Sequence, residues 1–422
     1  MRDARGVLEV VAIGDELLLG DTLESNGAWL GRALGEQGIR VGRRTIVGDD
    51  AQAIRAAVAD ALERTGLVIC SGGLGPTRDD VTKNAVAELY GRALRIDVGW
   101  LDRLRERFAA RGITMTPSNE QQAAVPEGAI VFDNARGTAP GLAVEDERGA
   151  TVLLPGVPIE FRGLIEDRVR DWLVSRMSGR SAPIRSRVLR TTGVPESRLG
   201  ERVDDLLAGI APLSLAFLPS TAGVDLRFTS WGTLAADEAD QALERAVDRF
   251  REHLGISVYA TGADELAAIV GAALVEKGFT LALAESCTGG LIAKWLTDAP
   301  GASRFFMAGL VTYADDAKRD LLGVPADTLA THGAVSEESV LAMVEGARRA
   351  TGASAGIAVT GIAGPEGGTP TKPVGTVWIA AAVGPRVQSR LLRLRGTRSE
   401  IRERCAQAAL DLLRRLLLEP LA

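Results

Sequence analysis

The chain has 422 residues, more than a single hydrophobic core usually supports, so two or three domains are expected. Hydrophobic residues make up 46% and charged residues 25% of the chain, as in ordinary folded proteins. The net charge of −6 and the lack of a basic tract argue against nucleic acid and acidic membrane surfaces as partners.

No apolar run approaches the roughly 20 residues of a membrane span. Charged residues within positions 1–5 precede an apolar strand, a pattern unlike a signal peptide. Cys70, Cys287 and Cys405 lie far apart without a metal-binding spacing, as expected for free thiols in a reducing compartment. The sequence therefore predicts a cytoplasmic protein.

The first part of the chain alternates predicted strands and helices. Apolar strands at 8–13, 39–47 and 67–70 are separated by helical stretches at 26–36 and 51–64. Such alternation predicts a parallel sheet with helices on its faces. Ligands of such sheets bind beside the carboxyl ends of the strands.

Glycines and acids cluster at these strand ends. Gly72, Gly73 and Gly75 can bring a diphosphate against backbone N–H groups. Four carboxylates can hold a divalent cation, which would polarise a phosphoryl oxygen or activate water. These are Asp15, Asp49, Asp79 and Asp80. The alternative is that one of the last two acids caps the next helix and that the glycines only turn the chain. Three acid-bearing strand ends together favour function.

The middle part, about 181–261, has the pattern of a small α+β domain. Between residues 181 and 260, nine arginines and eleven acids leave a net charge of −2, and no Gly-x-x-Gly loop is present. A spacer or a dimer-forming module is therefore favoured over an RNA binder. Its predicted elements are a strand at 184–191, a helix at 196–207, strands at 213–218 and 224–230, a helix at 237–254 and a strand at 256–259.

The third part starts near residue 264. An apolar strand at 279–284 leads into AESCTGG at 284–290, and a helix follows. Ser286 and Cys287 are both candidate nucleophiles, and the helix start offers N–H groups to an anion. The alternative for the cysteine is a small buried thiol.

The serine needs a base, and the chain contains two histidines. His253 is expected on the surface of the middle domain, and His332 is most simply a structural hydrogen-bonding residue. Tyr313 and Lys318 provide another base, since a desolvated lysine beside a tyrosine can take a hydroxyl proton. Taken singly, the tyrosine is typical of a strand-end core residue and the lysine of a solvated helix charge.

Further residues are candidates for binding phosphate or ribose. The two arginines of the last helix are four residues apart, on one face, and can clamp a phosphate. Their alternative is surface salt bridging with Glu400 or Glu403. The binding candidates are Thr288, Gly289, Gly290, Thr360, Arg398 and Arg402.

Four motifs of the first part resemble the CinA family, the competence/damage-inducible proteins of bacteria. That half of the family is similar to molybdopterin-binding domains of the MogA/MoaB type, whose important acids correspond to Asp49 and Asp80. The resemblance implies ADP-ribose pyrophosphatase activity with a divalent cation (Mg, Mn or Co), with potassium as a further cation, giving AMP and ribose 5-phosphate. The motifs are GDELLLG at 14–20, GGLGPTRDDVT at 72–82, GTAPG at 137–141 and LPGVP at 154–158.

The third part resembles nicotinamide mononucleotide deamidase through residues 284–290, GAS at 301–303, VTY at 311–313 with Lys318, and VTGIAGP at 359–365. The family usually has GSS where this chain has GAS, so one hydroxyl is missing. The resemblance assigns catalysis to Ser286, Tyr313 and Lys318, without a cofactor. It assigns substrate binding to Ser303, Thr360 and an arginine that is either Arg398 or Arg402.

The sequence thus predicts an α/β protein with a parallel-sheet domain at 1–175, a small α+β domain at 181–261 and a deamidase domain at 264–422. The predicted function is hydrolysis of nicotinamide mononucleotide and of ADP-ribose by a homodimer, without direct nucleic acid or membrane contact. Two alternatives remain. The first part binds a pterin or nucleotide without turning it over, or the chain is a competence-related interaction protein.

Overall fold

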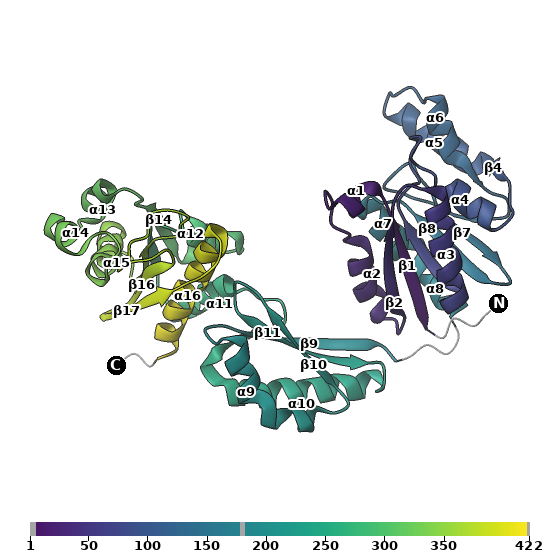
Figure 1. The fold of residues 1–422 in the computed structure, drawn as a ribbon. Helices are drawn as coiled ribbons and strands as arrows, with labels where there is room; N and C mark the ends of the chain where they lie inside the picture. Colours follow the sequence, from purple (N-terminus) through teal and green to yellow (C-terminus); the bar gives the residue numbers. More distant parts are fainter. Residues whose placement is uncertain (1–5, 178–181, 420–422) are drawn as a thin grey trace. The chain divides into compact units, whose positions relative to one another are not determined.

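The computed structural model describes residues 6–177 and 182–419 (Figure 1). The charged N-terminal positions 1–5 and the predicted boundary residue 181 lie outside the described residues. Contacts divide the chain into two compact units, one of Met1–Arg185 with Ser230–Asp240 and one of Ser186–Thr229 with Gln241–Ala422. The predicted α/β class is confirmed. Among the described residues, no helix combines the length and apolarity needed to cross a bilayer.

The first unit is built on a six-stranded sheet of order β2-β1-β3-β8-β7-β6. The pairs β1–β2, β1–β3 and β3–β8 are parallel, and β7 and β6 add antiparallel strands at one edge. The sheet is therefore mostly parallel, as predicted. Its strands are β1 (Val7–Ile13), β2 (Arg40–Val47), β3 (Leu67–Ser71), β6 (Ile130–Phe132), β7 (Gly141–Asp146) and β8 (Gly149–Leu154).

Helices cover both faces of this sheet because its central strands are apolar on both sides. From β1, Leu8 and Val10 pack into the core under α2, α7 and α8, while Val11 and Ile13 pack into the core under α3 and α4. The carboxyl ends of β1 and β3 remain open to loops. The helices are α1 (Asp15–Leu19), α2 (Asn26–Gly35), α3 (Ala51–Thr65), α4 (Thr82–Leu89), α7 (Pro158–Leu164) and α8 (Arg170–Arg176).

A helical insertion lies between α4 and β6. It contains α5 (Val98–Ala110) and α6 (Pro117–Glu120), flanked by β4 (Leu94–Ile96) and β5 (Ala124–Pro126), which form a separate two-stranded sheet. Trp100 and Leu104 of α5 are fully buried in a small core of their own. The insertion thus has its own apolar anchor beside the main sheet.

The middle region forms a four-stranded sheet of order β10-β11-β9-β12. The amphipathic helices supply apolar residues such as Val203 and Phe250 to one core together with Phe228 of the sheet. All of the predicted elements are present here, in the predicted order. They are β9 (Ile184–Thr191), α9 (Glu196–Leu207), β10 (Ser214–Pro219), β11 (Val224–Trp231), α10 (Ala236–Leu254) and β12 (Val258–Thr261).

The last region holds a five-stranded sheet of order β14-β13-β15-β16-β17. β13 pairs in parallel with β14 and β15, and β16 and β17 continue antiparallel. The strands are β13 (Leu281–Glu285), β14 (Phe306–Val311), β15 (Ala355–Gly361), β16 (Thr376–Val383) and β17 (Arg386–Arg393).

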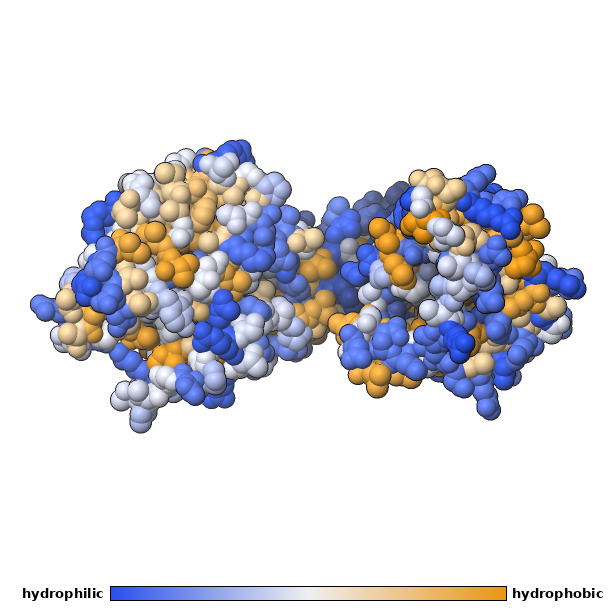
Figure 2. Space-filling view, turned by 90° about the horizontal axis from the view of Figure 1, so that it is seen from above, coloured by the Kyte–Doolittle hydropathy of each residue, from blue (hydrophilic) through white to orange (hydrophobic). Residues whose placement is uncertain are grey.

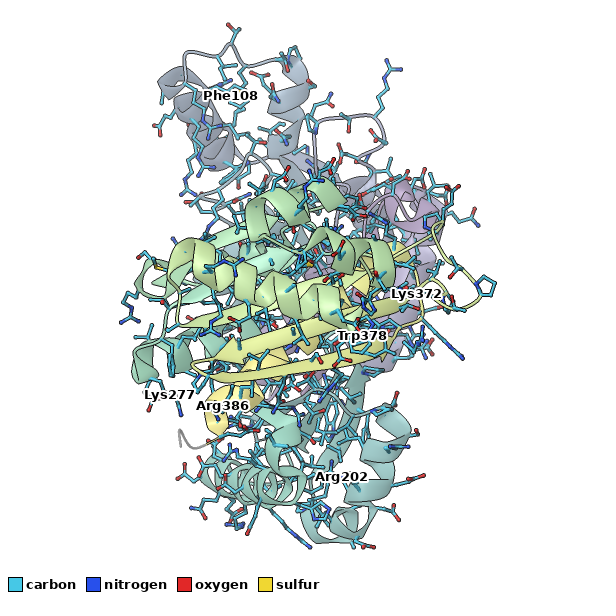
Figure 3. All side chains as sticks on the ribbon, turned by 90° about the vertical axis from the view of Figure 1, so that its left-hand side faces the viewer. Phe108, Arg202, Lys277, Lys372, Trp378 and Arg386 are labelled. Carbon is cyan, nitrogen blue, oxygen red and sulfur yellow. The ribbon has the colours of Figure 1, made fainter. Side chains whose placement is uncertain are left out.

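This second sheet also separates two cores, with Leu281 and Leu283 facing α11, α12 and α16, and Ala282 and Ala284 facing α15. The loop between β15 and β16 is tied down by Lys372 (Figure 3), whose ammonium donates to the carbonyl oxygen of His332 at 2.8 Å. Polar and apolar residues are mixed over the face shown in Figure 2. The helices are α11 (Leu266–Lys277), α12 (Leu291–Asp298), α13 (Asp315–Leu322), α14 (Ala326–His332), α15 (Glu337–Thr351) and α16 (Arg398–Leu418).

A buried ion pair fixes the end of α16 to the middle region. The side chains of Asp411 and Arg414 are 4% and 5% exposed, with 2.7 Å between Oδ1 and Nη2. Arg414 also donates to the carbonyl oxygens of Ile256 at 2.5 Å and Val258 at 3.3 Å. A single guanidinium therefore serves a buried carboxylate and two backbone carbonyls.

We expect Arg414→Leu to lower the free energy of unfolding by about 3–5 kcal/mol, because it leaves a buried carboxylate and two carbonyls without this partner. The matched control is Lys294→Leu, which removes an exposed ion pair to Asp298 and should cost less than about 1 kcal/mol. Urea denaturation followed by circular dichroism measures both. Equal effects of the two variants would contradict the structural role of the buried pair.

Candidate functional site

Three predicted residues of the third part lie at neighbouring strand ends. Ser286 follows β13, Tyr313 follows β14 by two residues, and Thr360 lies at the end of β15. The N–H of Ser286 donates to the carbonyl oxygen of Val359 at 3.0 Å, which fixes the serine against the neighbouring strand. The carboxyl edge of this sheet is thus one candidate site.

Lys318 is buried at this edge, with 1% of its surface exposed. Its ammonium donates to the carbonyl oxygen of Tyr313 at 3.0 Å and lies 3.4 Å from Oδ1 of Asp315. The Tyr313 side chain is exposed, and its hydroxyl accepts a hydrogen bond from Arg398 at 3.0 Å. The alternatives of a solvated lysine and a core tyrosine are both wrong.

The two candidate nucleophiles have different surroundings. Among the described residues, the hydroxyl of Ser286 has no hydrogen-bond partner, so both its proton and its lone pairs are available. Cys287 belongs to the hydrophobic core, where the thiol of Cys405 donates to its sulfur. This bond lowers the pKa of Cys287, and burial raises the pKa of Cys405 well above its ordinary value. The cysteine is turned into the core, which favours the serine.

Glu285 occupies the N-terminus of α12. Its carboxylate, 1% exposed, accepts from the N–H groups of Gly290 at 3.0 Å, Ile292 at 3.2 Å and Ala293 at 2.9 Å. The N–H of Gly289 donates to the serine carbonyl at 3.0 Å. The expectation that this helix start offers free N–H groups to an anion is therefore wrong at Gly289 and Gly290. Their backbones, with φ of 59° and 90°, serve the turn.

Two arginines of α16 reach the loops around the serine. Arg402 donates to the carbonyl oxygen of Thr288 at 2.6 Å, and Arg398 donates to that of Gly364 at 2.7 Å. The Thr288 hydroxyl is buried without a partner among the described residues. Both guanidinium groups retain further N–H donors.

Neither arginine forms the alternative ion pair within residues 182–419. Glu400 lies 3.7 Å from Arg404, and Glu403 accepts from Ser399 at 3.0 Å and from Thr221 at 2.8 Å. The surface-salt-bridge interpretation of the two site arginines is wrong.

Thr360 lies at this edge with its hydroxyl already engaged, and Ser303 lies elsewhere. The Thr360 hydroxyl donates to the carbonyl oxygen of Ala334 at 2.7 Å, so its proton is already used. Ser303 lies in the turn Ala302–Arg304, which precedes β14. Because β14 has six residues, Ser303 is separated from the edge that holds Ser286 by roughly 20 Å of strand. The structure does not bring Ser303 to this site.

The histidines are both engaged elsewhere. His253 contacts the carbonyl oxygen of Arg202 at 2.6 Å, and His332 lies 3.4 Å from Glu338. These contacts agree with the structural interpretation of both histidines and leave Lys318 as the remaining candidate base.

The first unit contains a cavity of about 480 Å³ at the carboxyl ends of β1, β3 and β8. Asp15 does not line it, although the neighbouring Glu16 does. The predicted residues that line the cavity are Asp49, Gly72, Gly73, Gly75, Asp79 and Asp80.

The glycine loop presents part of its backbone to this cavity. Gly72 and Gly73 have φ of 115° and 67°, and a Cβ at Gly73 would collide with the Thr82 hydroxyl. The N–H of Gly72 donates to Leu154 at 3.0 Å. In the described part of this unit, the N–H groups of Gly73 and Leu74 have no acceptor. These two donors can receive an anion.

Asp80 supports the glycine loop from within. Its Oδ1 accepts from the N–H of Gly75 at 2.7 Å, and its Oδ2 accepts from the N–H of Thr77 at 2.8 Å and from the Thr77 hydroxyl. Both carboxylate oxygens thus accept hydrogen bonds from the loop, so Asp80 stabilises the conformation of the loop that lines the cavity.

The predicted four-carboxylate cage is not formed. Asp15 and Asp49 bond each other's backbone, with 3.0 Å from the Asp15 N–H to Oδ2 of Asp49 and 3.2 Å in return. Burial, followed by repulsion from Asp15, Glu16 and Asp79, raises the pKa of Asp49. No group of three or more acids, histidines or cysteines among the described residues can hold a metal ion. The cage is wrong because three of its acids, Asp15, Asp49 and Asp80, accept hydrogen bonds from backbone N–H groups.

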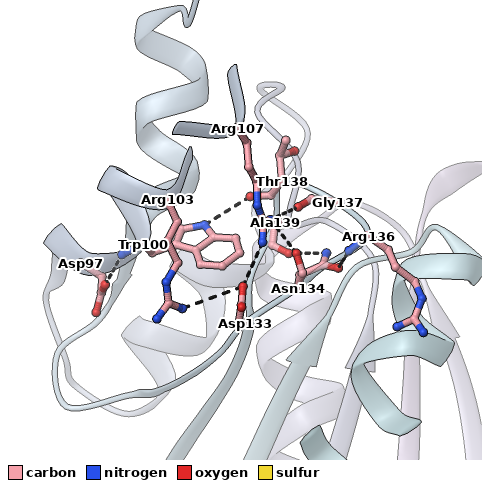
Figure 4. A network of polar contacts seen from close by, with 10 residues as sticks. All are labelled: Asp97, Trp100, Arg103, Arg107, Asp133, Asn134, Arg136, Gly137, Thr138 and Ala139. Carbon is pink, nitrogen blue, oxygen red and sulfur yellow. Dashed lines mark hydrogen bonds and ion pairs between the residues drawn. The ribbon is translucent and has the colours of Figure 1, made fainter. Parts of the chain in front are cut away.

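Sequence reasoning missed two residues of this cavity, Asn26 and Glu160. Burial raises the pKa of Glu160, which accepts a hydrogen bond from Asn134 at 2.7 Å. Figure 4 shows how Arg107 and Trp100 of α5 hold the loop around Asn134. The position of Glu160 just after the LPGVP turn was a signal in the sequence, whereas Asn26 carried none.

Models of known protein families match each of the three regions of the chain. Residues 9–175 match the model of a probable molybdopterin binding domain, residues 186–260 that of the damage-inducible protein CinA KH domain, and residues 263–417 that of the CinA C-terminal domain. Together with the two sheets and their strand-end sites, these matches identify a multidomain protein with a MoaB/MogA-like N-terminal domain. The Gly-x-x-Gly loop by which KH domains clamp RNA is absent from 181–261.

Relatives match along the whole chain. A CinA-like protein of Gemmatimonas aurantiaca is 48% identical over 97% of this chain and 96% of its own. A putative competence-damage inducible protein of Symbiobacterium thermophilum is 45% identical over 98% of this chain and 99% of its own. The chain belongs to the CinA family. The solved competence/damage inducible protein CihA of Agrobacterium tumefaciens is 42% identical over 36% of this chain and 96% of its own, with a TM-score of 0.35.

We expect Glu285→Gln to lower the free energy of unfolding by about 3 kcal/mol, because an amide offers one oxygen where three buried N–H groups need acceptors. Glu276→Gln is the matched control, since that residue is exposed on α11. Thermal unfolding measures both variants. Equal stability of the two would show that the cap contributes little.

Proposed function

We propose that the C-terminal site hydrolyses the carboxamide of nicotinamide mononucleotide to nicotinate mononucleotide and ammonia. Membership of the CinA family supports a hydrolase of nucleotide-like substrates. The observation that carries the proposal is an unpartnered Ser286 hydroxyl at the strand end next to Tyr313 and the buried Lys318. A serine nucleophile with a buried lysine as its base is the pairing that serine–lysine hydrolases use.

In the proposed reaction, Ser286 Oγ attacks the amide carbon while its proton passes to the Tyr313–Lys318 pair. The proton then leaves with the ammonia, and water releases the carboxylate from the acyl-enzyme. Because the Gly289 and Gly290 N–H groups are engaged, the oxyanion donor is assigned to the N–H of Thr288, which has no acceptor in the described chain. Arg398 and Arg402 then hold the 5′-phosphate through their remaining donors.

The serine assignment is tested by Ser286→Ala beside Cys287→Ala, two neighbouring residues of similar size. We expect the serine variant to lose about 10³-fold or more in ammonia release, because the nucleophile is gone. The cysteine variant should stay within about threefold of the unmodified protein, because its thiol lies in the core. Loss only in the cysteine variant would identify a thiol enzyme and refute the assignment.

We propose that the N-terminal cavity cleaves ADP-ribose to AMP and ribose 5-phosphate. The support is a cavity of about 480 Å³ that combines two free N–H donors, on Gly73 and Leu74, with crowded carboxylates. Asp49 and Asp79 line it, and they are the residues assigned to a divalent cation, although the Asp79 carboxylate also bonds the Thr77 side chain and Asp49 accepts from the Asp15 N–H. Mg²⁺ commonly uses one or two carboxylates together with substrate phosphates. When bound, such a cation polarises a phosphoryl oxygen or activates water.

One observation favours a second candidate, binding without turnover. Asp80, the acid that the family resemblance makes important, is engaged with the loop, and no three-ligand metal cluster is preformed among the described residues. Calorimetry with ADP-ribose, with and without a chelator, followed by product identification distinguishes the two. Tight binding without product would favour the binding module.

The choice among Mg, Mn and Co, the role of potassium and the homodimer stay predictions.

The two acids are separated by Asp80→Asn and Asp49→Asn. Asp80→Asn should weaken nucleotide binding about tenfold or more even with chelator, because the amide nitrogen cannot accept from the loop N–H groups. Asp49→Asn should abolish only the metal-dependent part of binding and cleavage. Full metal-dependent cleavage by Asp80→Asn would show that this site is wrong.

The interaction-protein alternative is tested directly by a mobility-shift assay with DNA and RNA at physiological salt. The net charge of −6 and the missing Gly-x-x-Gly loop predict no shift. A shift that persists at this salt would favour the interaction class instead.

A further inference from the structure

The N-terminal cavity contains a buried acceptor that no protein group satisfies. Asn26 is 6% exposed and lines the cavity, and its Oδ1 has no hydrogen-bond partner among the described residues. Its Nδ2 donates to Ser71 Oγ at 2.9 Å and to the carbonyl oxygen of Gly156 at 2.8 Å. Because a carbonyl can only accept, the orientation of this amide is fixed and the unpaired atom is its oxygen.

A second acceptor lies on the same side of the cavity. Glu160 accepts from Asn134 through Oε2 at 2.7 Å, and in the described chain its Oε1 has no partner. The Asn134 amide is itself fixed as a donor, since its nitrogen also donates to Ala139 at 2.8 Å and its oxygen accepts from Arg136 at 3.0 Å. Glu160 therefore presents a free carboxylate oxygen to the cavity.

Both acceptors are attached to the turn after β8, and this turn touches the glycine loop. Asn26 holds the Gly156 carbonyl, and the N–H of Glu160 donates to Val157 at 3.1 Å. A Cβ at Gly156 would lie 3.4 Å from the Cα of Gly72, which is van der Waals contact. The acceptors and the N–H donors of the glycine loop thus line one cavity and are joined through the contact of Gly156 with Gly72.

The cavity offers N–H donors on the glycine loop and oxygen acceptors on Asn26 and Glu160, and this difference indicates which ligand groups each part can bind. A phosphate carries acceptor oxygens, which suit the N–H groups of the glycine loop but not an amide oxygen and a carboxylate. A sugar hydroxyl carries the proton that these two atoms lack, and carboxylates commonly bind ribose hydroxyls. A buried acceptor left unpaired is unfavourable, so a ligand that supplies a donor gains where one without it does not.

We propose that Asn26 and Glu160 form a subsite for ribosyl hydroxyls beside the glycine loop, so that the N-terminal cavity selects a phosphorylated ribose over its deoxy counterpart. The subsite deepens the proposed ADP-ribose function and rests on it for the identity of the natural ligand. The selectivity itself is a property of binding and is measured without turnover.

The test is calorimetry in the presence of chelator with three probes: ribose 5-phosphate, 2-deoxyribose 5-phosphate and inorganic pyrophosphate. We expect the unmodified protein to prefer ribose 5-phosphate over the deoxy sugar by about tenfold or more. Glu160→Gln should reduce this preference to about twofold or less while pyrophosphate binding is retained, since a neutral amide is a weaker partner for a hydroxyl. Asn26→Ala should reduce the preference in the same way.

Glu166→Gln, an exposed neighbour in the following turn, is the matched control and should keep the full preference. An unmodified protein that binds both sugars equally, or neither, overturns the subsite, as does a preference unchanged in both variants. The proposed hydrolase activity is tested independently, and it is refuted if the unmodified protein leaves ADP-ribose intact with metal present. A preference for ribose 5-phosphate in that case still supports the subsite.

Discussion

Carboxylates that accept hydrogen bonds from loop N–H groups determine the shape of both sites. Glu285 takes three N–H groups at the start of α12, and Asp80 takes the N–H groups of Gly75 and Thr77. In each case a carboxylate of the protein itself accepts from N–H groups that the glycine-rich loop would otherwise offer to a ligand. External anions must therefore be bound by other groups. These are the α16 arginines in one unit and the N–H groups of Gly73 and Leu74 in the other.

The arrangement of strands and helices was largely predictable, because burial on both faces of a parallel sheet produces continuous apolar runs such as β1 and β3. The middle elements were equally clear from their spacing. The α5–α6 insertion was not resolved by the sequence, because its anchor is a local core around Trp100 and not a strand of the sheet.

Site residues were predictable only where they lie at or directly after the end of a predicted strand. Ser286, Tyr313 and Thr360 meet because parallel strands end at one edge. The direction of a carboxylate is set by which N–H groups surround it in the folded chain, so the predicted cage of Asp15, Asp49, Asp79 and Asp80 was wrong. Ser303 lies at the other end of β14 from Ser286, because a family motif states a residue type and not the end of the strand beside which it lies.

One helix links distant parts of the second unit. α16 runs from Arg398 to Leu418, about 30 Å at 1.5 Å per residue. Its first two turns carry the guanidinium groups beside Ser286, and its last turns are fastened to Ile256 and Val258 through Arg414. A helix of this length moves nearly as a rigid rod. Because Thr221 also bonds Glu403 near the start of α16, the small α+β module holds this rod at both ends and thereby sets where Arg398 and Arg402 stand.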